Sequence, residues 1–193
     1  MAHPFSISSK ESVLIIIDLQ ERLSQVLNQE ILAQVCKNIN LLTTLAVEQQ
    51  IPILLTQQYP EGLGPTIDPI KKILLGKKYE TLDKLSFSCC HDEKFNKKLK
   101  SLRRKKIILV GMETHVCVYL TALGLISQSY KPFVASDAVI SRSKSNFKNG
   151  LSLLGDIGAV VSNSEPLLFQ LMERSGTSSI KKISALLKHN SVS

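Results

Sequence analysis

The chain contains no tryptophan, and aromatic side chains make up only 5% of its 193 residues. Long hydrophobic runs are missing too: the longest, Val13 to Ile17, is far shorter than the roughly 18 residues needed to span a bilayer. The first six residues show no basic region followed by an apolar one, which is the pattern of a secretory signal. These absences predict a soluble protein of the cytoplasm that makes no contact with a membrane.

Cysteines are few and follow no recognisable framework. The four lie at positions 36, 89, 90 and 117, without a Cys-x-x-Cys motif or zinc-finger spacing. A bridge between the adjacent Cys89 and Cys90 would be strained. We therefore expect no disulfides and no structural zinc, and at most one thiol with a special chemical use.

Acidic residues are outnumbered, with 16 Asp and Glu against 24 Lys and Arg, and the net charge is +8. Much of the excess lies in the stretch 94–106, where Phe95, Leu99 and Leu102 recur at the spacing of one helix face. The basic residues occupy the other faces, which predicts a solvated helix surface. The one aromatic of the stretch, Phe95, falls on the apolar face and is not interleaved for base stacking. We therefore expect no nucleic-acid partner.

Apolar residues make up 44% of the chain and charged residues 21%, which is close to the usual globular balance. This composition excludes a disordered chain, because enough apolar surface can be buried to offset the ordering entropy. The length suits one ordinary domain, so we expect residues 1–193 to form a single domain.

The apolar pattern alternates between two types along the chain. Short runs rich in β-branched residues, typical of buried parallel strands, alternate with stretches in which apolar residues recur at helical spacing. The runs cover 12–18, 53–56, 107–111, 132–135 and 158–161, and the helical stretches cover 28–50, 115–129, 144–155 and the C-terminal part of the chain. A short strand-like piece surrounds Lys84. This order predicts an α/β protein: a three-layer α/β/α Rossmann-like fold with a mostly parallel six-stranded sheet.

Ligands of open α/β sheets bind at the carboxyl ends of the strands, so residues there are the candidates for function. Asp18 ends the first strand, where a buried carboxylate is costly without partners. It could equally be a helix N-cap or a ligand of the following turn. Gln20, two residues further on, could point into the same cleft.

A second candidate is Cys117, in the segment 111–118 between a predicted strand and helix. In the first turn of a helix, free amides and the helix dipole would lower the pKa of its thiol and could hold an oxyanion. The alternative is a small buried hydrophobic residue, the commonest role of a free cysteine. The neighbouring His115 could act as a base or as a structural hydrogen-bond partner.

Lys84 is the third candidate, flanked by apolar residues in Leu82 to Ser88. A lysine in such a place either extends along the surface to reach water or is a buried cation held by a carboxylate.

Three segments together resemble the isochorismatase-like cysteine hydrolases, a superfamily that includes nicotinamidases and carbamoylsarcosine amidase. They are Ile-Ile-Asp-Leu-Gln around Asp18, Lys-Leu-Ser-Phe-Ser from Lys84, and Gly-Met-Glu-Thr-His-Val-Cys-Val around Cys117, and they occur in the order of the family. The resemblance covers roughly 12–164. The segment from Thr56 to Thr66 further resembles the small isochorismatase-domain-containing proteins, whose substrates are mostly unassigned.

The resemblance implies an Asp-Lys-Cys triad. In this triad Cys117 would be the nucleophile that forms a thioester, Asp18 would carry the proton, and Lys84 would stabilise the ionised groups. It also implies an oxyanion hole made by the backbone N–H groups of Glu113 and Cys117, and a cis peptide bond between Met112 and Glu113.

Departures from the patterns of two branches of the family narrow the range of possible substrates. Nicotinamidases carry an Asp-x-His metal motif after the second strand, where this chain has Gln57, Gln58 and Tyr59. Amides and a phenol are poor replacements for these ligands, so we expect no metal and no other cofactor, and nicotinamidase activity is doubtful. True isochorismatases cleave a vinyl ether and lack the cysteine, so Cys117 favours the amidase-like branch.

The leading hypothesis is therefore a metal-independent cysteine hydrolase that cleaves a small amide-like C–N bond. The alternative is a non-catalytic protein on the same fold that binds a small molecule or senses thiol oxidation, because oxidation also needs a cysteine of low pKa. By position, Gln20, Gln57, Tyr59 and Leu85 would line the substrate pocket. Phe87 and Tyr119 could shape the pocket or pack in the core. The resemblance also implies a homo-oligomer.

Overall fold

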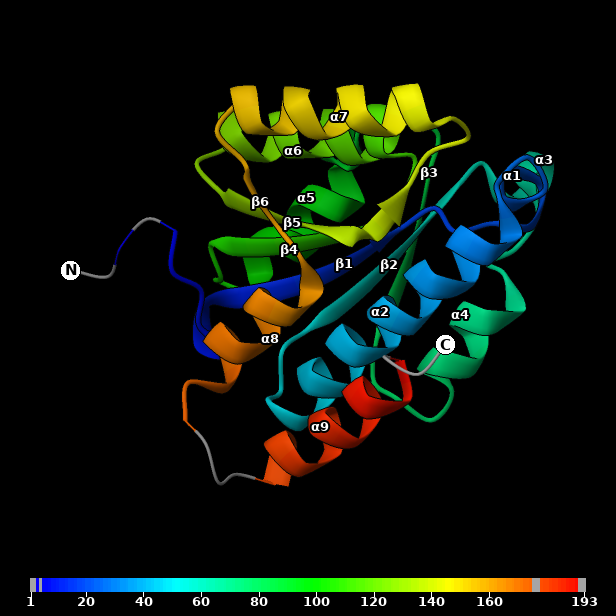
Figure 1. Cartoon of the computed structure of the whole chain (residues 1–193). Coiled ribbons are helices and arrows are strands. Elements are labelled where there is room, and N and C mark those ends of the chain that lie inside the picture. The colour runs from blue at the N-terminus through cyan, green and yellow to red at the C-terminus, as the bar shows by residue number, and fades with distance from the viewer. Residues whose placement is uncertain (1–2, 4, 175–177, 191–193) are drawn as a thin grey trace.

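The computed structural model, which describes residue 3 and residues 5–174 and 178–190, is built around one sheet of six parallel strands (Figure 1). The strand order is β3-β2-β1-β4-β5-β6, and every pair of neighbours is parallel. The strands are β1 (Ser12–Ile17), β2 (Ile53–Gln58), β3 (Glu80–Lys84), β4 (Lys106–Met112), β5 (Lys131–Ile140) and β6 (Val160–Ser162). The prediction of a six-stranded, mostly parallel sheet is confirmed.

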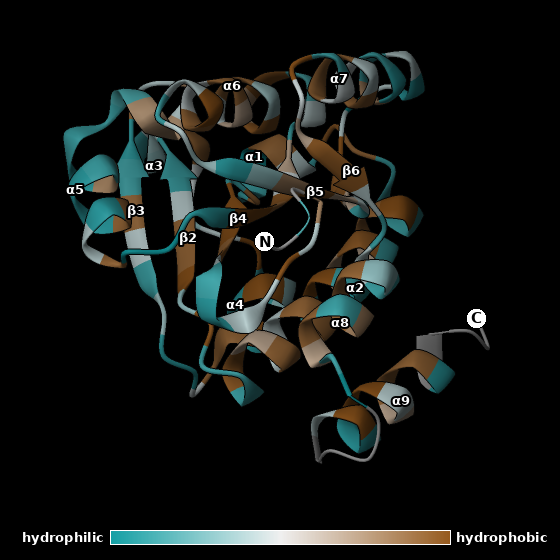
Figure 2. Cartoon of the chain, turned by 90° about the vertical axis from the view of Figure 1, so that its left-hand side faces the viewer, coloured by the Kyte–Doolittle hydropathy of each residue, from teal (hydrophilic) through white to brown (hydrophobic). Residues whose placement is uncertain are grey.

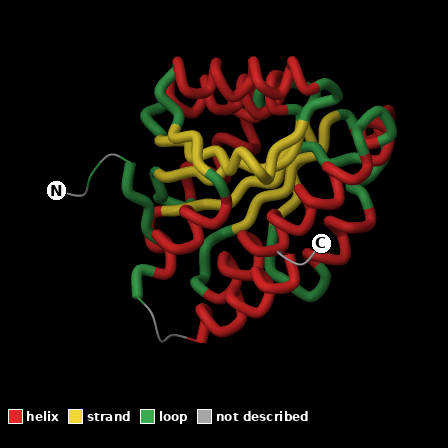
Figure 3. The backbone as a smooth tube through the Cα atoms, viewed as in Figure 1, coloured by secondary structure: helices red, strands yellow, loops and turns green. Residues whose placement is uncertain are grey.

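Helices cover both faces of the sheet, so the predicted three layers are present (Figures 1 and 3). One face carries α5 (Glu93–Ser101), α6 (Tyr119–Ser127) and α7 (Lys144–Asp156). The other carries α2 (Gln29–Glu48), α4 (Asp68–Leu74), α8 (Ser164–Met172) and α9 (Ser178–Asn190). The short helices α1 (Glu21–Ser24) and α3 (Pro60–Leu63) lie side by side at the carboxyl end of the sheet. No helix in the described ranges combines the length and apolar character needed to cross a bilayer.

The core is divided by the sheet into two apolar clusters, as the unbroken apolar run of β1 predicts. Val13, Ile15 and Ile17 face α5, α6 and α7, whereas Leu14 and Ile16 face the helices of the opposite layer. All five are at most 1% exposed. Because both faces are covered, each strand needs apolar residues at consecutive positions rather than at alternate ones. Figure 2 shows the same pattern as brown faces of α2 and α8 turned towards the sheet.

The basic stretch around α5 behaves as its spacing predicts. Phe95 and Leu99 are buried, each 1% exposed, and pack in the cluster between α5 and the sheet. The lysines of the helix lie on its outer side, and α5 is largely teal in Figure 2.

Two regions differ from the sequence prediction. The chain between β2 and β3, for which the sequence predicts no helix, contains α3 and α4, which are too short to produce a visible helical period. Strand β5 is longer than the predicted run 132–135, and its pairing with β4 is interrupted. Val134 pairs with Leu109, but the next pair is Val139 with Gly111. The intervening residues do not continue the register with β4, although Ala135 still pairs with Ser162 of β6, so the strand does not read as one apolar run.

The direction of chain progression reverses between β1 and β4. From β1 the chain adds β2 and β3 on one side, and from β4 it adds β5 and β6 on the other. The two strands approach closely at Gly111, whose φ is +111° and where an added Cβ would lie 2.2 Å from the carbonyl oxygen of Ile17. Loops leaving the two strands diverge at such a point and open a crevice beyond the sheet, the usual ligand site of this architecture.

Candidate active site

The three candidate residues meet at this crevice. Asp18 directly follows β1, Lys84 is the last residue of β3, and Cys117 lies in the turn after β4. Asp18 has a φ of +49°, an uncommon conformation for a residue with a side chain, and it turns the chain out of the sheet. Segments 66 and 99 residues apart are thus brought together at one edge of the sheet by parallel pairing alone.

Lys84 is a buried cation held by a carboxylate, which decides between its two sequence interpretations. Its Nζ donates hydrogen bonds to Asp18 Oδ2 at 2.6 Å and to Gln58 Oε1 at 2.7 Å, and more weakly to the carbonyls of Ser86 and Phe87 at 3.2 and 3.3 Å. Burial is the largest single influence and opposes the charged ammonium, but the charge of Asp18, its hydrogen bond and the nearby thiols of Cys89 and Cys117 together raise the pKa of Lys84. The lysine therefore stays protonated.

Asp18 is completely buried and has a polar partner on each carboxylate oxygen. The Thr56 hydroxyl donates to Oδ1 at 2.7 Å, and the Lys84 ammonium donates to Oδ2 at 2.6 Å. The backbone N–H of Asp18 donates to the carbonyl of Thr56 at 3.2 Å, which continues the pairing of β1 with β2. These contacts fix the carboxylate in one orientation and satisfy the need of a buried charge for partners.

Cys117 lies in a single π-helical turn, Thr114–Val118, that precedes α6. Its side chain is 6% exposed, and its thiol is within hydrogen-bonding reach of Asp18. The expectation of a lowered thiol pKa is wrong for this arrangement. Burial first, and then the negative charge of Asp18, raise the pKa of Cys117 despite the opposing effect of Lys84. The thiol is protonated and adjacent to a base.

The turn that carries Cys117 is anchored to the end of β5. The Met112–Glu113 peptide bond is cis, at the place that the family resemblance implies. The Glu113 carbonyl accepts hydrogen bonds from the amides of Val116 and Val118, on either side of Cys117. The Glu113 side chain accepts a bond from the Arg142 amide at 3.1 Å.

His115 takes its structural role in this turn. Its Nδ1 hydrogen-bonds to Ser141 Oγ at 3.0 Å, which ties the turn to the residue that follows β5.

Comparison with known proteins identifies the family. The model of the isochorismatase domain matches residues 12–166. The chain belongs to the isochorismatase family. It is 34% identical to isochorismatase domain-containing protein 2 of Danio rerio over 194 residues, which cover 96% of this chain and 91% of that protein. The resemblance to the superfamily and to its small isochorismatase-domain proteins is thereby confirmed.

Solved structures of related proteins share the fold of this isochorismatase-family chain. A structure described as the MAR1 ribonuclease from Caenorhabditis elegans superposes with a TM-score of 0.86 at 30% identity, covering 94% of this chain and 92% of that one. The YcaC protein of Escherichia coli, described as an octameric hydrolase of unknown specificity, superposes with a TM-score of 0.83 at 17% identity over the whole of both chains.

The predicted pocket residues of this family member fall into two groups. Gln20 and Gln57 are engaged by the protein itself: Gln20 bonds to the backbone of Gln58 and Gly64, and Gln57 bonds to Asp83 and Thr66. Their amides act as clamps between loops.

The second group is exposed. Tyr59, Leu85 and Phe87 follow β2 and β3 directly and are 48%, 77% and 59% exposed. They are large, exposed side chains close in sequence to groups of the site, since Leu85 and Phe87 follow Lys84 and Tyr59 follows Gln58. Tyr119 is half-buried and packs against the apolar cluster beneath α6, so its role is core packing.

Two polar contacts of the triad, Thr56 and Gln58, lie at a strand end where the sequence places candidate residues, but the sequence gives them no role. Both lie on β2, between the strands that carry Asp18 and Lys84, and Gln58 pairs with Lys84 in the sheet register. The available signal was the sequence Thr56-Gln57-Gln58, which interrupts the apolar character of β2 beside the ends of β1 and β3, where Asp18 and Lys84 lie. Gln58 Nε2 donates to the Leu85 carbonyl at 2.6 Å, so its oxygen is turned towards Lys84.

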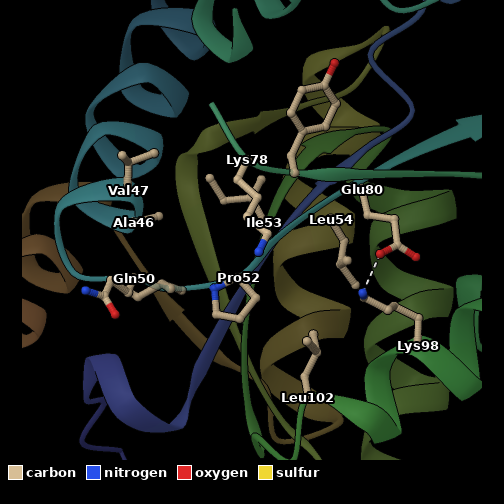
Figure 4. Close-up of a pocket in the computed structure, with 12 residues that line it drawn as sticks. Ala46, Val47, Gln50, Pro52, Ile53, Leu54, Lys78, Glu80, Lys98 and Leu102 are labelled. Atoms are coloured by element: carbon tan, nitrogen blue, oxygen red, sulfur yellow. Dashed lines mark ion pairs between the residues drawn. The ribbon is translucent and has the colours of Figure 1, made fainter. Parts of the chain in front are cut away.

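Other features of the molecule lie apart from this crevice. A cavity of about 480 Å³ at the amino end of β2 and β3 is lined by apolar residues and crossed by the Lys98–Glu80 ion pair (Figure 4). It contains none of the triad residues. Within the described residues, no group of three or more His, Cys, Asp or Glu side chains is arranged to hold a metal ion. The expected metal-free site stays a prediction.

Proposed function

We propose that this isochorismatase-family chain is a metal-independent cysteine hydrolase that cleaves a small amide-like C–N bond. The observation that carries the proposal is that one buried carboxylate, Asp18, contacts both the ammonium of Lys84 and the thiol of Cys117. A nucleophile, a base and a cation beside the base are the parts required for covalent acyl transfer.

The proposed reaction proceeds in two halves. Asp18 takes the thiol proton as Cys117 Sγ bonds to the acyl carbon, and the same carboxyl gives that proton to the departing nitrogen as the C–N bond breaks. The acyl group is then held as a thioester. In the second half Asp18 takes a proton from water, whose oxygen attacks the thioester carbon, and the proton returns to the sulfur as the acid leaves.

The surroundings support this sequence of proton transfers. The raised thiol pKa keeps the proton on Cys117 until a substrate arrives, and it then moves over a single hydrogen bond. Backbone N–H groups of Glu113 and Cys117 are the proposed donors to the oxyanion of each half-reaction. Lys84, fixed by Gln58, is the proposed partner of the Asp18 carboxyl group between proton transfers.

The proposed substrate is a small molecule. Cys117 is 6% exposed and the carboxylate of Asp18 is not exposed at all, so only a narrow group reaches the sulfur. Tyr59, Leu85 and Phe87 would contact the rest of the substrate and favour an apolar body. Gln20 and Gln57 are assigned to loop positioning instead.

Two other candidates receive less support. A redox sensor needs a thiol of low pKa, whereas burial and Asp18 raise the pKa of Cys117. The relative described as a ribonuclease raises RNA as a substrate, but the large residues after β2 and β3 are apolar, and Lys98 of α5 pairs with Glu80, at the opposite end of β3 from Lys84. The prediction that nucleic acid is not a partner is retained.

Homo-oligomerisation is part of the proposal. It is supported by the exposed apolar residues at the site, and the distant YcaC protein is described as octameric. A cytoplasmic location stays a prediction that four free, buried cysteines favour.

A panel of small aliphatic and aromatic amides, scored for ammonia release, tests the function. Turnover is expected for at least one class, with loss of more than about 1,000-fold in Cys117→Ala and Asp18→Ala. Cys36→Ala, which removes another buried thiol outside the crevice, is the matched control and should retain turnover. Circular dichroism must show that the variants fold. Turnover that survives Cys117→Ala would refute the mechanism.

A further inference from the structure

A second cavity, separate from the triad, opens at the carboxyl end of β5. Its volume is about 450 Å³, within the range of small-molecule sites. It is formed by the first half of α2, the bulge of β5 and the segment that leads into α7. Because α2 and α7 cover opposite faces of the sheet (Figure 1), the cavity spans the edge of the sheet between the two layers.

The wall of the cavity is apolar. Val35, Val139 and Ile140 are buried, Phe147 is half-buried, and Ile31 is 55% exposed at the entrance. An exposed isoleucine beside a hollow of this size leaves apolar surface that a ligand of matching character would cover.

The charged groups of the cavity favour an anion. Arg142 and Lys144 lie at its rim and both are exposed. The acidic residue of the lining, Asp137, is already satisfied: Oδ1 accepts from the Ser164 amide and Oδ2 from the Ser164 hydroxyl, each at 2.7 Å. No acidic partner of Lys144 is present among the described residues.

We propose that this cavity binds a small organic anion with one anionic group on an apolar body, such as an aryl or alkyl carboxylate. The apolar body would lie against Val139 and Phe147, and the anionic group would pair with Arg142 and Lys144. The bulge of β5 shapes one side of the cavity, because the residues between Val134 and Val139 leave the register with β4, and the Asp137 carbonyl there accepts a hydrogen bond from Asn38 of α2 at 2.7 Å.

The site is connected to the turn that carries Cys117. Arg142 Nε lies 3.7 Å from Glu113 Oε1, so an anion that draws the guanidinium into the cavity competes with the Glu113 carboxylate. A ligand in the cavity therefore weakens the ion pair between Arg142 and Glu113, the residue that follows the cis peptide bond. This communication bears on the proposed function, whereas binding itself does not depend on it.

The absence of tryptophan makes binding measurable with a single reporter. Phe147→Trp places an indole in the cavity wall, and Phe169→Trp, at a 53% exposed position on α8, is the matched control. The probe is 3-phenylpropionate, and the neutral comparison is 3-phenylpropan-1-ol. We expect a saturable fluorescence change with the acid in Phe147→Trp alone, and binding of the alcohol weaker by about tenfold or more.

Charge variants and the unmodified chain complete the experiment. Calorimetric affinity for 3-phenylpropionate should fall about tenfold in Arg142→Gln/Lys144→Gln and stay unchanged in Lys94→Gln/Lys97→Gln, which removes two exposed cations of α5. Equal affinity for acid and alcohol, or no loss in the first double variant, would overturn the site. An unchanged rate of Cys117 alkylation at saturating acid would overturn the communication, and neither result would bear on amide turnover.

Discussion

Lys84 Nζ lies 2.6 Å from Asp18 Oδ2, and neither side chain exposes more than 2% of its surface. For a pair so completely removed from water, forming the pair and breaking it have very different effects on stability. The intact pair contributes little net stability, but loss of one partner leaves an uncompensated charge in the interior. The pair is therefore costly to keep unless the chemistry of the site requires it.

Removal of Lys84 tests this asymmetry. We expect Lys84→Met to lower the free energy of unfolding by about 3–5 kcal/mol, because the buried carboxyl group of Asp18 loses its paired cation. The matched control is Lys182→Met, which removes the exposed partner of Glu48 and should cost at most about 1 kcal/mol. Urea denaturation measures both variants, and equal losses would contradict the interpretation.

The charge of Asp18 should also control the reactivity of Cys117. In Asp18→Asn the largest electrostatic cause of the raised thiol pKa is removed while Lys84 remains, so the thiolate fraction at pH 7 rises. We therefore expect faster alkylation by iodoacetamide together with loss of amide turnover. Adducts mapped by mass spectrometry give the rate at Cys117 relative to Cys36. Slower alkylation in this variant would contradict the proposed electrostatics.

Thr56 should be required for the orientation of Asp18. Thr56→Val keeps the shape but removes the donor to Oδ1, and leaving a buried acceptor unpaired costs about 1–3 kcal/mol. Turnover should fall as well, because the carboxylate can rotate away from the thiol. Thr56→Ser keeps the hydroxyl and is the control, so a similar fall in both variants would assign the effect to packing instead.

Stability should decline at alkaline pH. Burial raises the pKa of Cys36 and Cys89 to about 11, above the ordinary value near 9. A thiol whose pKa is raised by folding keeps its proton in the native state and loses it in the unfolded state, so stability is lost as pH rises from about 9 to about 11. The free energy of unfolding measured across this interval should fall, and Cys36→Ala should show a shallower fall.

Gly111 should tolerate no side chain. Its φ is +111° and an added Cβ would lie 2.2 Å from the Ile17 carbonyl oxygen, so Gly111→Ala should prevent folding or cost several kcal/mol. Gly76→Ala is the control: φ is +71° but nothing lies within 4 Å, and a loss of only about 1 kcal/mol is expected. Similar thermal shifts in the two variants would show that conformation rather than the close approach matters.

The sequence is sufficient to predict the strands and to propose the members of the candidate triad. It is not sufficient to predict the other contacts of the site. Apolar runs such as 12–18 identify buried strands, because only burial on both faces explains them. Gln57 and Gln58 cannot be distinguished in this way, since the register of β2 against β3 decides which amide faces Lys84. The thiol pKa of Cys117 also depends on burial and on Asp18, and helix position alone gives the wrong direction.

The amide of Gln20 joins parts of the chain that would otherwise move separately. It donates to the carbonyls of Gln58 and Gly64 and accepts from the amide of Gln58, while the side chain of Gln58 holds Lys84. The loop that contains α3 cannot swing outwards without pulling on the end of β2. Entry of a substrate from that side would thus strain the hydrogen bond between Gln58 and the Lys84 ammonium. Movement of the loop would in this way change the position of the ammonium in the triad.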